Sequence, residues 1–583
     1  MKDCFVMDNN ETGVWWGMGD VTGGAIPLSH LETVEDASLY TGEIQRHKIG
    51  GLIRRVWISS NGIMVTMPFA SRASFSVDFA VGKSTGKFCL ASDRGLNLDN
   101  NEIKTIPTLD YTLCTGSTVH SLLMNLRNIE KMDDIEYSTS KWHGLVHRGP
   151  EDIREVSVPE ITQQMLDEIQ ERFRCPVWKP WLSHNEGRID QNDVLQYVEE
   201  ITANDVRVCG YVLLPVLWQE KIGNLEFDKV RFPNPSFLVE SLLRKGLRLA
   251  LTLSPLIDTE TQRFKNSAIA DLLIKQINST LPILVSTNHA TAAGVLDFTN
   301  SNTVTWFADQ LKSLRLEYGI DSFHLSPANT QSLPPFRHHH SSHQNPDYAL
   351  NQFLLSVSRI RAPISTDASV IPVNPPTFLT AGYGDAGWSI LKQLPNRIVS
   401  ISAVGGTLVD SGVVGGWSNQ KGHIPDRELF LRWFQVSVFL PAMQISVLPS
   451  MYDPMLQSIV KDLIRIREHD VIPRFMENLN ETLTNGYPLV SPLALIFPKD
   501  SKSLTIRDQW FVGQDLMVAP ILRRGRRARD IYLPPGIWKD GLDERLLKGK
   551  RWLKGYVVSL GKVPRFFSIT PERGNKGKRI PKA

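Results

Sequence analysis

The sequence has 583 residues, more than one hydrophobic core usually supports, which predicts several domains or one barrel with smaller domains beside it. Hydrophobic residues make up 42% and charged residues 21%, and these values exclude a disordered chain, a collagen or a coiled coil. The formal net charge of only +3 provides no global attraction to nucleic acid or to an anionic membrane, so neither is expected as a partner.

The cysteines and the first residues bear on the compartment. Five widely separated cysteines lack the C-x-x-C spacing of zinc or redox sites, which predicts buried thiols with at most two disulfides. Residues 1–10 contain no apolar run of signal-peptide length. The uncharged stretch 433–451 contains two prolines and two glutamines, so a buried helix and strand are expected there rather than a membrane span. The sequence alone determines neither the compartment nor the oligomeric state.

The first part of the chain, residues 1–165, is predicted to form a β-sandwich. Residues 50–58, 62–67 and 73–79 alternate apolar and polar side chains and are separated by glycine and serine, a pattern typical of antiparallel strands. No motif with chemistry of its own occurs in this part.

Residues 170–475 change to an alternation of strands and helices, which predicts a (β/α)8 TIM barrel. The stretch 322–325 is a short apolar strand that ends at Ser326, and barrel enzymes place their chemistry at the carboxyl ends of strands. Strands are expected at 176–178, 210–214, 248–253, 322–325, 363–365, 398–401 and 442–448. Helices are expected at 191–203, 235–245, 302–318 and 429–439.

After a helix at 455–468, residues 480–570 are predicted to form a second β-sandwich. Its strands are expected at 493–497, 509–513, 516–520 and 530–534. The basic run 523–529 and the basic tail 571–583 have no interleaved aromatic residues. A solvated hairpin tip and a loose terminus are therefore expected, and a nucleic-acid site is not.

Several motifs resemble those of glycoside hydrolase family 31 and occur in the order of that family. Residues 227–235 read FDKVRFPNP, 295–300 read VLDFTN, 427–433 read RELFLRW, 513–520 read GQDLMVAP and 532–538 read YLPPGIW. Together they extend over most of residues 170–540. The run 441–444, PAMQ, is similar to the same run in one branch of the family.

The resemblance implies retaining glycoside hydrolysis by two carboxyl groups, one acting as nucleophile and one as acid and base. The family's nucleophile position falls on Ser326, and its acid/base position, five residues before Trp388, falls on Tyr383. A serine without an adjacent base is neither anionic nor a good leaving group. Asp385, three residues before Trp388, is a displaced candidate acid, although a two-residue shift exceeds the positional tolerance of a catalytic group.

Other positions of the family's pocket have also changed. The acidic pair after the second strand falls on Pro215 and Val216, a lysine falls on His324, and a late aspartate falls on Gly412. These losses affect one chemical site while the packing motifs remain. Candidate sugar-binding residues are Trp218, His324, Asn329, Trp388 and Asp410, since aromatic stacking and polar hydrogen bonds hold sugars without chemistry. Simple packing is the alternative for each of them.

Two functional hypotheses follow. The first is a glycosidase-like barrel that has lost its catalytic carboxyls and binds a glycan or a protein, with a carbohydrate or a glycoprotein as the expected partner. The second is an active retaining α-glycosidase that uses Asp385 with Asp258, Asp367 or Asp410. No cofactor is expected. The histidine-rich run 337–343 is flanked by prolines, and no acidic or cysteine partner is expected nearby, so no metal site is expected there. Ser326 and His324 lie too far apart along one strand for a serine-hydrolase pair.

Overall fold

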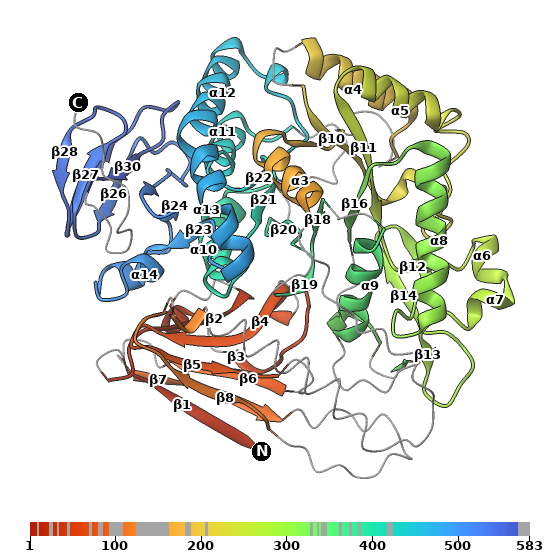
Figure 1. Cartoon of the computed structure of the whole chain (residues 1–583), viewed down its shortest axis with the longest axis horizontal. Helices are drawn as coiled ribbons and strands as arrows, with labels where there is room; N and C mark the ends of the chain where they lie inside the picture. Colours follow the sequence, from red (N-terminus) through yellow and green to blue (C-terminus); the bar gives the residue numbers. More distant parts are fainter. Residues whose placement is uncertain are drawn as a thin grey trace.

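The computed structural model of the chain contains three parts in sequence order, visible as the red, central and blue regions of Figure 1. The structure describes residues 1–8, 11–21, 27–31, 34–43, 47–68, 73–79, 85–92, 109–119, 121–123, 162–180, 188–203, 208–326, 330–334, 337–339, 347–360, 364–371, 376–382, 386–416 and 424–569. Asn329, Tyr383, Asp385 and the tail 571–583 lie outside these residues.

The N-terminal part consists of two sheets packed face to face, as the alternating pattern predicted. One sheet has the order β1 (Lys2–Asp8), β7 (Thr85–Ser92), β6 (Ala73–Phe79), β3 (Val34–Ser38). The other has the order β19 (Ser369–Val370), β4 (Ile49–Ser59), β5 (Ile63–Thr66), β8 (Thr112–Thr115), and β2 (Trp15–Val21) pairs with β4. Trp57 of β4 stacks on Phe75 and Phe88 of the first sheet, with ring centroids 5.6 and 5.7 Å apart. These rings form the centre of the core between the sheets.

The central part is a closed barrel of eight parallel strands. In chain order they are β9 (Val177–Trp178), β10 (Gly210–Leu214), β11 (Leu247–Leu253), β16 (Ser322–Leu325), β18 (Ser365–Thr366), β20 (Leu379–Thr380), β21 (Val409–Val413) and β22 (Ala442–Ile445). β22 pairs with β9 and closes the barrel. Strands of two to seven residues are sufficient because helices and loops cover the barrel and bury almost every strand residue.

The outer helices are α3 (Gln163–Arg174), α4 (Gln191–Ala203), α5 (Pro235–Arg244), α8 (Ser301–Tyr318), α9 (Tyr348–Ser358), α10 (Trp388–Ala403), α11 (Arg427–Ser437) and α12 (Pro454–Ile466). Five of these eight outer helices, α4, α5, α8, α11 and α12, lie at or near the predicted ranges, whereas α3, α9 and α10 were not predicted. α8 ends at Gly319, whose φ of 70° is left-handed and suits a residue without a Cβ. Because this cap leads directly into β16, the end of α8 determines where β16 begins and therefore where Ser326 lies.

Two predicted strands are helical, and both expectations were wrong. Residues 398–401 belong to α10, and residues 493–496 form α14 (Leu493–Ile496). The β-branched run in α10 has helical structure because this helix is buried over most of its surface, with β2 and β23 (Val490–Pro492) packed against it. The sixth and seventh barrel strands are therefore β20 and β21, which the apolar pattern did not predict.

The C-terminal part is rich in sheet. Six strands have the order β23, β24 (Trp510–Val512), β25 (Leu516–Val518), β30 (Arg565–Ser568), β27 (Ile537–Asp540), β28 (Leu546–Lys548), and a separate hairpin pairs β26 (Ala528–Leu533) with β29 (Arg551–Val557). The boundary expected between 475 and 480 falls inside α13 (Ile472–Asn485), which connects the barrel to this part without a linker.

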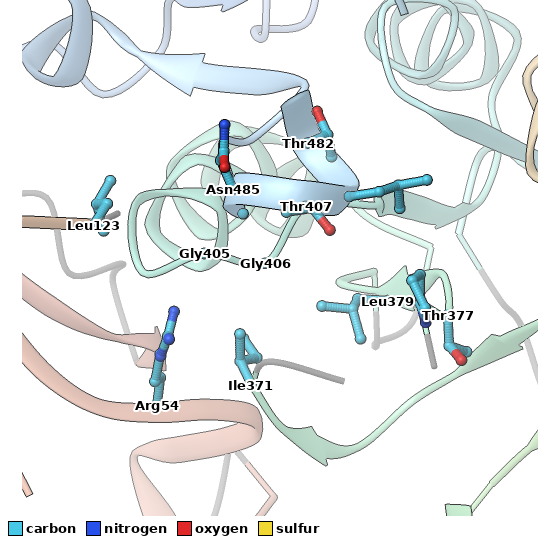
Figure 2. A pocket seen from close by; sticks show the side chains of 13 residues that line it. Arg54, Leu123, Ile371, Thr377, Leu379, Gly405, Gly406, Thr407, Thr482 and Asn485 are labelled. Carbon is cyan, nitrogen blue, oxygen red and sulfur yellow. The ribbon is translucent and has the colours of Figure 1, made fainter. Parts of the chain in front are cut away.

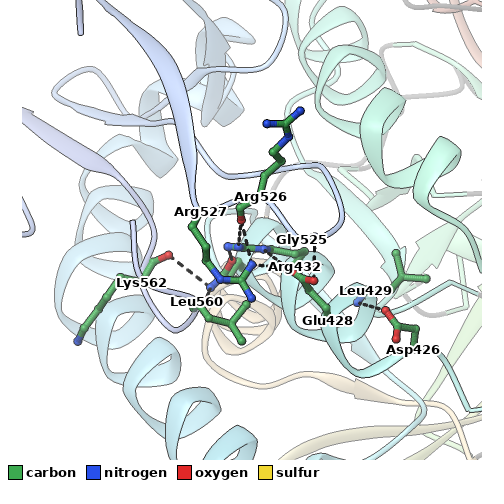
Figure 3. Close-up of polar contacts among 10 residues, drawn as sticks. Asp426, Glu428, Leu429, Arg432, Gly525, Arg526, Arg527, Leu560 and Lys562 are labelled. Atoms are coloured by element: carbon green, nitrogen blue, oxygen red, sulfur yellow. Dashed lines mark hydrogen bonds and ion pairs between the residues drawn. The ribbon is translucent and has the colours of Figure 1, made fainter. Parts of the chain in front are cut away.

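The basic run 523–529 is exposed, but it is docked on the barrel rather than only solvated. Gly525 donates its backbone N–H to Glu428 Oε2 over 3.0 Å, and Arg527 pairs with Glu428 Oε1 over 2.6 Å. Arg432 donates to the Arg526 carbonyl oxygen over 2.9 Å (Figure 3). The run therefore binds the first turn of α11, which corrects the expectation of a free hairpin tip.

Buried polar contacts also join the N-terminal sandwich to the barrel. Arg397 of α10 makes a two-bonded ion pair with Asp20 of β2, at 2.8 and 2.9 Å. Thr41 Oγ donates to Asp347 Oδ1 over 2.8 Å, and Thr330 Oγ donates to the same oxygen over 2.5 Å. The Thr330 backbone N–H also donates to Thr41 Oγ over 3.1 Å, which joins Thr330 directly to the N-terminal part.

Two disulfides, Cys4–Cys89 and Cys175–Cys209, are present, and Cys114 is a free thiol. This agrees with the expected maximum of two. Among the described residues, no helix is both long and apolar enough to cross a membrane.

Candidate functional site

The carboxyl ends of the barrel strands form the mouth at which a TIM-barrel site is expected. Ser326 lies there, directly after β16, as predicted. It is half-buried, and its backbone N–H donates to the Leu253 carbonyl oxygen over 2.9 Å. The side chain expected at the family's nucleophile position is a hydroxyl, and it lies at the carboxyl end of the fourth strand.

His324 contacts two groups of the neighbouring strand β18 instead of Ser326. Its Nδ1 lies 2.7 Å from Ser365 Oγ, and its Nε2 lies 3.2 Å from Asp367 Oδ1. β16 and β18 are parallel, with His324 opposite Ser365, so Asp367 is placed laterally beside Ser326 at the mouth. A carboxylate thus occurs one strand away from Ser326. Ser365 is fully buried and is not accessible as a nucleophile.

Asp410 of β21 is fully buried in a hydrogen-bonded cluster. Gly412 N donates to its Oδ1 over 2.7 Å, and Gln444 Nε2 of β22 donates to both carboxylate oxygens at 3.1 and 3.0 Å. Thr380 of β20 donates to Oδ2 over 3.3 Å. Burial raises the pKa of Asp410, and the hydrogen bonds from Gly412 and Gln444 oppose that rise. Its lone pairs are largely committed within the protein.

Gly412, the position at which the resemblance led us to expect a family aspartate, cannot accommodate a side chain in this backbone. Its φ is +67°, and a Cβ would lie 2.4 Å from the Gly382 carbonyl oxygen. The close approach of β21 to the residues after β20 therefore requires a glycine at this position.

Lys179, which the sequence reasoning missed, also reaches the mouth. It follows β9 directly, and its N–H donates to the Ile445 carbonyl oxygen over 2.8 Å. Burial lowers the pKa of the Lys179 ammonium, while the carboxylates Asp367 and Asp410 oppose that shift. A single lysine after a two-residue strand belongs to no recognisable sequence motif. Its position becomes clear only from the strand pairing of the closed barrel.

The predicted aromatic residues have packing roles in this structure. Trp218 has no exposed surface, its Nε1 donates to the Thr252 carbonyl oxygen over 3.0 Å, and its ring meets Phe227 edge-on at 5.0 Å. Its ring presents no free face for sugar stacking. Trp388, the first residue of α10, is half-buried against the main core. The places of Asn329, Tyr383 and Asp385 lie outside the described residues.

Asp258 belongs to an excursion of the chain between β11 and α8. It ends β12 (Leu256–Asp258), which pairs with β15 (Ala290–Val295) and through it with β14 (Leu284–Thr287), outside the barrel. The Asp258 carboxylate accepts the Glu260 N–H over 2.8 Å and caps that turn.

The histidine run has an acidic neighbour after all. His339 Nδ1 lies 3.2 Å from Asp297 Oδ1, so the expectation that no acid lies near this run was wrong; residues 295–300 are distant in sequence and close in space. Within the described part of the chain, no group of three or more metal-ligating side chains comes together. His340 and His343 lie outside that part.

A separate cavity of about 50 Å³ lies away from the mouth, at the amino-terminal ends of β20 and β21. Figure 2 shows Arg54 of β4 and Ile371 across from Thr482 and Asn485 of α13. Gly405 has a φ of +92° and would place a Cβ 2.3 Å from Arg54 Nη1, which allows Arg54 to reach the Val404 carbonyl oxygen at 2.5 Å. The cavity belongs to the junction of the three parts.

The fold and the mouth define a class of protein, a TIM barrel of glycosidase type between two sheet-rich domains. Residues 178–363 match the TIM-barrel domain of glycosyl hydrolases family 31, and residues 486–568 match the C-terminal domain of that family. The chain belongs to glycoside hydrolase family 31, in the branch of the myogenesis-regulating glycosidase and the SITS-binding protein to which the run 441–444 pointed.

The relatives differ in how much of their length is matched. Mouse myogenesis-regulating glycosidase is 26% identical over 89% of this chain and 69% of that protein. The SITS-binding protein of Tetronarce californica is 28% identical over 55% of this chain, and the match spans about half of that protein, 48%.

Solved structures share the fold at low identity. A family 31 dextranase from Flavobacterium johnsoniae, complexed with glucose, has a TM-score of 0.75 at 17% identity, covering 97% of this chain and 66% of the dextranase. A family 31 sulfoquinovosidase from E. rectale has a TM-score of 0.74 at 16% identity, covering 98% and 83%.

Proposed function

We propose that this chain is a non-hydrolytic member of glycoside hydrolase family 31 that binds a glycan or glycoprotein at its barrel mouth. The observation that carries the proposal is Ser326, a hydroxyl at the carboxyl end of β16 where the reaction requires an ionised carboxylate. Serine cannot replace that group, because it is uncharged at neutral pH and the nearest imidazole in its strand, His324, is bonded to Ser365 and Asp367 instead.

The burial and hydrogen bonds of the other candidate catalytic acids support the same proposal. Asp410 is buried and accepts three donors, and Asp258 caps a turn outside the barrel strands. Retaining hydrolysis needs two carboxyls about 5–5.5 Å apart with opposite roles. Of the three described candidates, Asp258, Asp367 and Asp410, only Asp367 follows a barrel strand beside Ser326, and one carboxylate supports binding but not this reaction.

The competing candidate is a retaining α-glycosidase in which Asp367 serves as the displaced nucleophile with Asp385 as acid. The lateral position of Asp367 beside Ser326 is the observation that favours it. The two candidates predict opposite results with a mechanism-based label, because only a nucleophilic carboxylate forms a stable glycosyl ester.

The test uses the purified chain with aryl α-glycosides and an α-configured cyclitol epoxide or aziridine. We expect no turnover and no covalent label on the unmodified protein, and gain of labelling in Ser326→Asp combined with Tyr383→Asp. Ser332→Asp, an exposed serine, is the matched control for an added charge. Labelling of the unmodified chain at Asp367 would establish the competing candidate instead.

A further inference from the structure

The turn that follows β13 (Lys275–Gln276) presents an acceptor pattern for a covalent modification. Residues 278–280 read Asn-Ser-Thr, the Asn-x-Ser/Thr pattern to which secreted proteins attach N-linked glycans. The Gln276 N–H donates to the Leu281 carbonyl oxygen over 2.8 Å, so these three residues form the tip of a tight turn. The asparagine and the threonine are both exposed, and β13 itself lies at the periphery of the barrel part in Figure 1.

The fold explains the asparagine of this turn only in part and the threonine not at all. Asn278 has a left-handed φ of 53°, which asparagine tolerates, but that conformation makes no demand on the residue two positions later. Among the described residues, neither the Asn278 amide nor the Thr280 hydroxyl has a hydrogen-bond partner. By contrast, Asn266 and Asn300, between the same two barrel elements, each accept a backbone N–H and cap a helix.

A second copy of the pattern, at residues 480–482, has a structural explanation. Asn480 is exposed on α13, but Thr482 is only 2% exposed and packs on the inner side of that helix. A third copy begins at Asn10, outside the described residues. Of the two described copies, the one at 278–280 is therefore the one in which both necessary side chains are free of a packing role.

Two disulfides indicate that the chain folds in an oxidising compartment. Cys4 lies opposite Cys89 in the ladder of β1 and β7, and Cys175 and Cys209 precede the neighbouring barrel strands β9 and β10. Cytosolic thiols are kept reduced, so bonded pairs of this kind are typical of secreted and lumenal proteins. The mouse and Tetronarce relatives are animal proteins, and animal cells form disulfides and attach N-linked glycans in the same compartment.

We propose that Asn278 carries an N-linked glycan, a modification that does not depend on what the barrel mouth binds. The donor is an oligosaccharide joined to a lipid pyrophosphate, supplied by the transferase of that compartment. Asn278 Nδ2 forms a bond to the anomeric carbon, the bond from that carbon to the pyrophosphate oxygen breaks, the pyrophosphate leaves with the electron pair, and the amide loses one proton. Leu281 and Leu284, beside the tip, are 61% and 46% exposed, and the glycan covers this apolar surface.

Substitutions at Thr280 separate a glycan from a structural role of the asparagine. The full chain is produced in animal cells behind a cleavable signal peptide, and the peptide that contains Asn278 is analysed by mass spectrometry before and after treatment with peptide N-glycosidase in water labelled with heavy oxygen. We expect a glycan in the wild type and in Thr280→Ser, which keeps the acceptor pattern. We expect none in Thr280→Ala, which removes the pattern and leaves Asn278 in its turn. An unmodified Asn278 in the wild type, or a glycan on it in Thr280→Ala, would overturn the proposal.

Production of the same chain without a signal peptide tests the compartment. In the cytosol the four cysteines should remain reduced, and the chain should unfold at a lower urea concentration than the secreted protein after its glycan has been removed. Peptide mapping without reductant should show the bonds Cys4–Cys89 and Cys175–Cys209 in the secreted protein alone. Free thiols at these positions in the secreted protein, or equal urea midpoints of the two preparations, would remove the basis of the proposal. Labelling and sugar binding at the mouth have no bearing on either result.

Discussion

At the scale of single residues, Asp410 offers the clearest pH prediction. Burial raises its pKa above the ordinary 3.8, so the folded protein holds this proton more tightly than the unfolded chain does. The ionised carboxylate therefore costs stability at neutral pH. This loss of stability becomes smaller as the pH falls through the raised pKa of the folded protein. It is absent at pH values below the pKa of Asp410 in the unfolded chain.

Asp410→Asn should consequently be more stable than the wild type at pH 7, on the order of 1 kcal/mol. The Gln444 Oε1 atom has no partner among the described residues, so a turn of that amide lets it accept a hydrogen bond from the side-chain amide that the substitution introduces. Urea unfolding of both proteins from pH 7 to pH 4 measures the difference, which should shrink toward acid. A difference that grows toward acid would contradict a raised pKa.

Single residues also show which positions could be predicted from the sequence and which could not. Ser326 and His324 could be placed because a strand pattern and a spaced motif fixed their register. Asp367 could be named only as one of several displaced acids, since its meaning comes from the pairing of β16 with β18. Lys179 had no signal at all, because its position depends on closure of the barrel between β9 and β22.

At the scale of elements, the basic run 523–527 docks on α11 through the Glu428 carboxylate, and the contribution of this charge to stability can be tested. Although burial acts to raise it, hydrogen bonds from Gly525 and Arg527 hold the pKa of Glu428 below its ordinary value. A carboxyl group whose pKa is lowered by folding stabilises the folded protein at pH values above its pKa in the unfolded chain. This stabilisation is lost as the pH falls through the pKa of the folded protein.

Glu428→Gln should therefore lose about 1–3 kcal/mol at pH 7, the usual worth of a hydrogen bond to a charged group, and the loss should diminish toward acid. Denaturant unfolding measures the loss, and proteolysis near residues 523–527 reports release of the run. Glu240→Gln, in an exposed helical pair with Arg244, is the matched control and should change little. Equal effects of the two substitutions would show that the docking contributes nothing.

Helices could be predicted where their apolar residues recur with the helical period. α4, α5 and α8 have amphipathic patterns and end at or near the expected residues. Residues 398–401 failed because a helix buried on nearly all sides is apolar all round, and its β-branched run then looks like a strand. β20 has two residues in the barrel ladder, too few for any pattern, and β18, also two residues long, overlaps the expected strand 363–365 only at Ser365.

At the scale of the whole molecule, a buried ion pair joins the N-terminal part to the barrel. Asp20 and Arg397 are 4% and 6% exposed and satisfy each other with two hydrogen bonds across the junction of β2 and α10. Gly50 lies so close that a Cβ there would be 2.0 Å from Asp20 Oδ2. Neither sequence segment alone shows this pair, since 377 residues separate its members.

Removing one member of such a pair leaves the other charge buried without a partner, which typically costs about 3–5 kcal/mol. Asp20→Ala should therefore lower the free energy of unfolding by that amount, measured with urea, while Glu240→Ala changes it by less than about 0.5 kcal/mol. If the junction couples the parts, the variant should unfold in two steps, with the β-sandwich first, as followed by Trp fluorescence and circular dichroism. Coincident transitions with a small loss would mean that water reaches Arg397 and that the sandwich and barrel are held together by their apolar contacts instead.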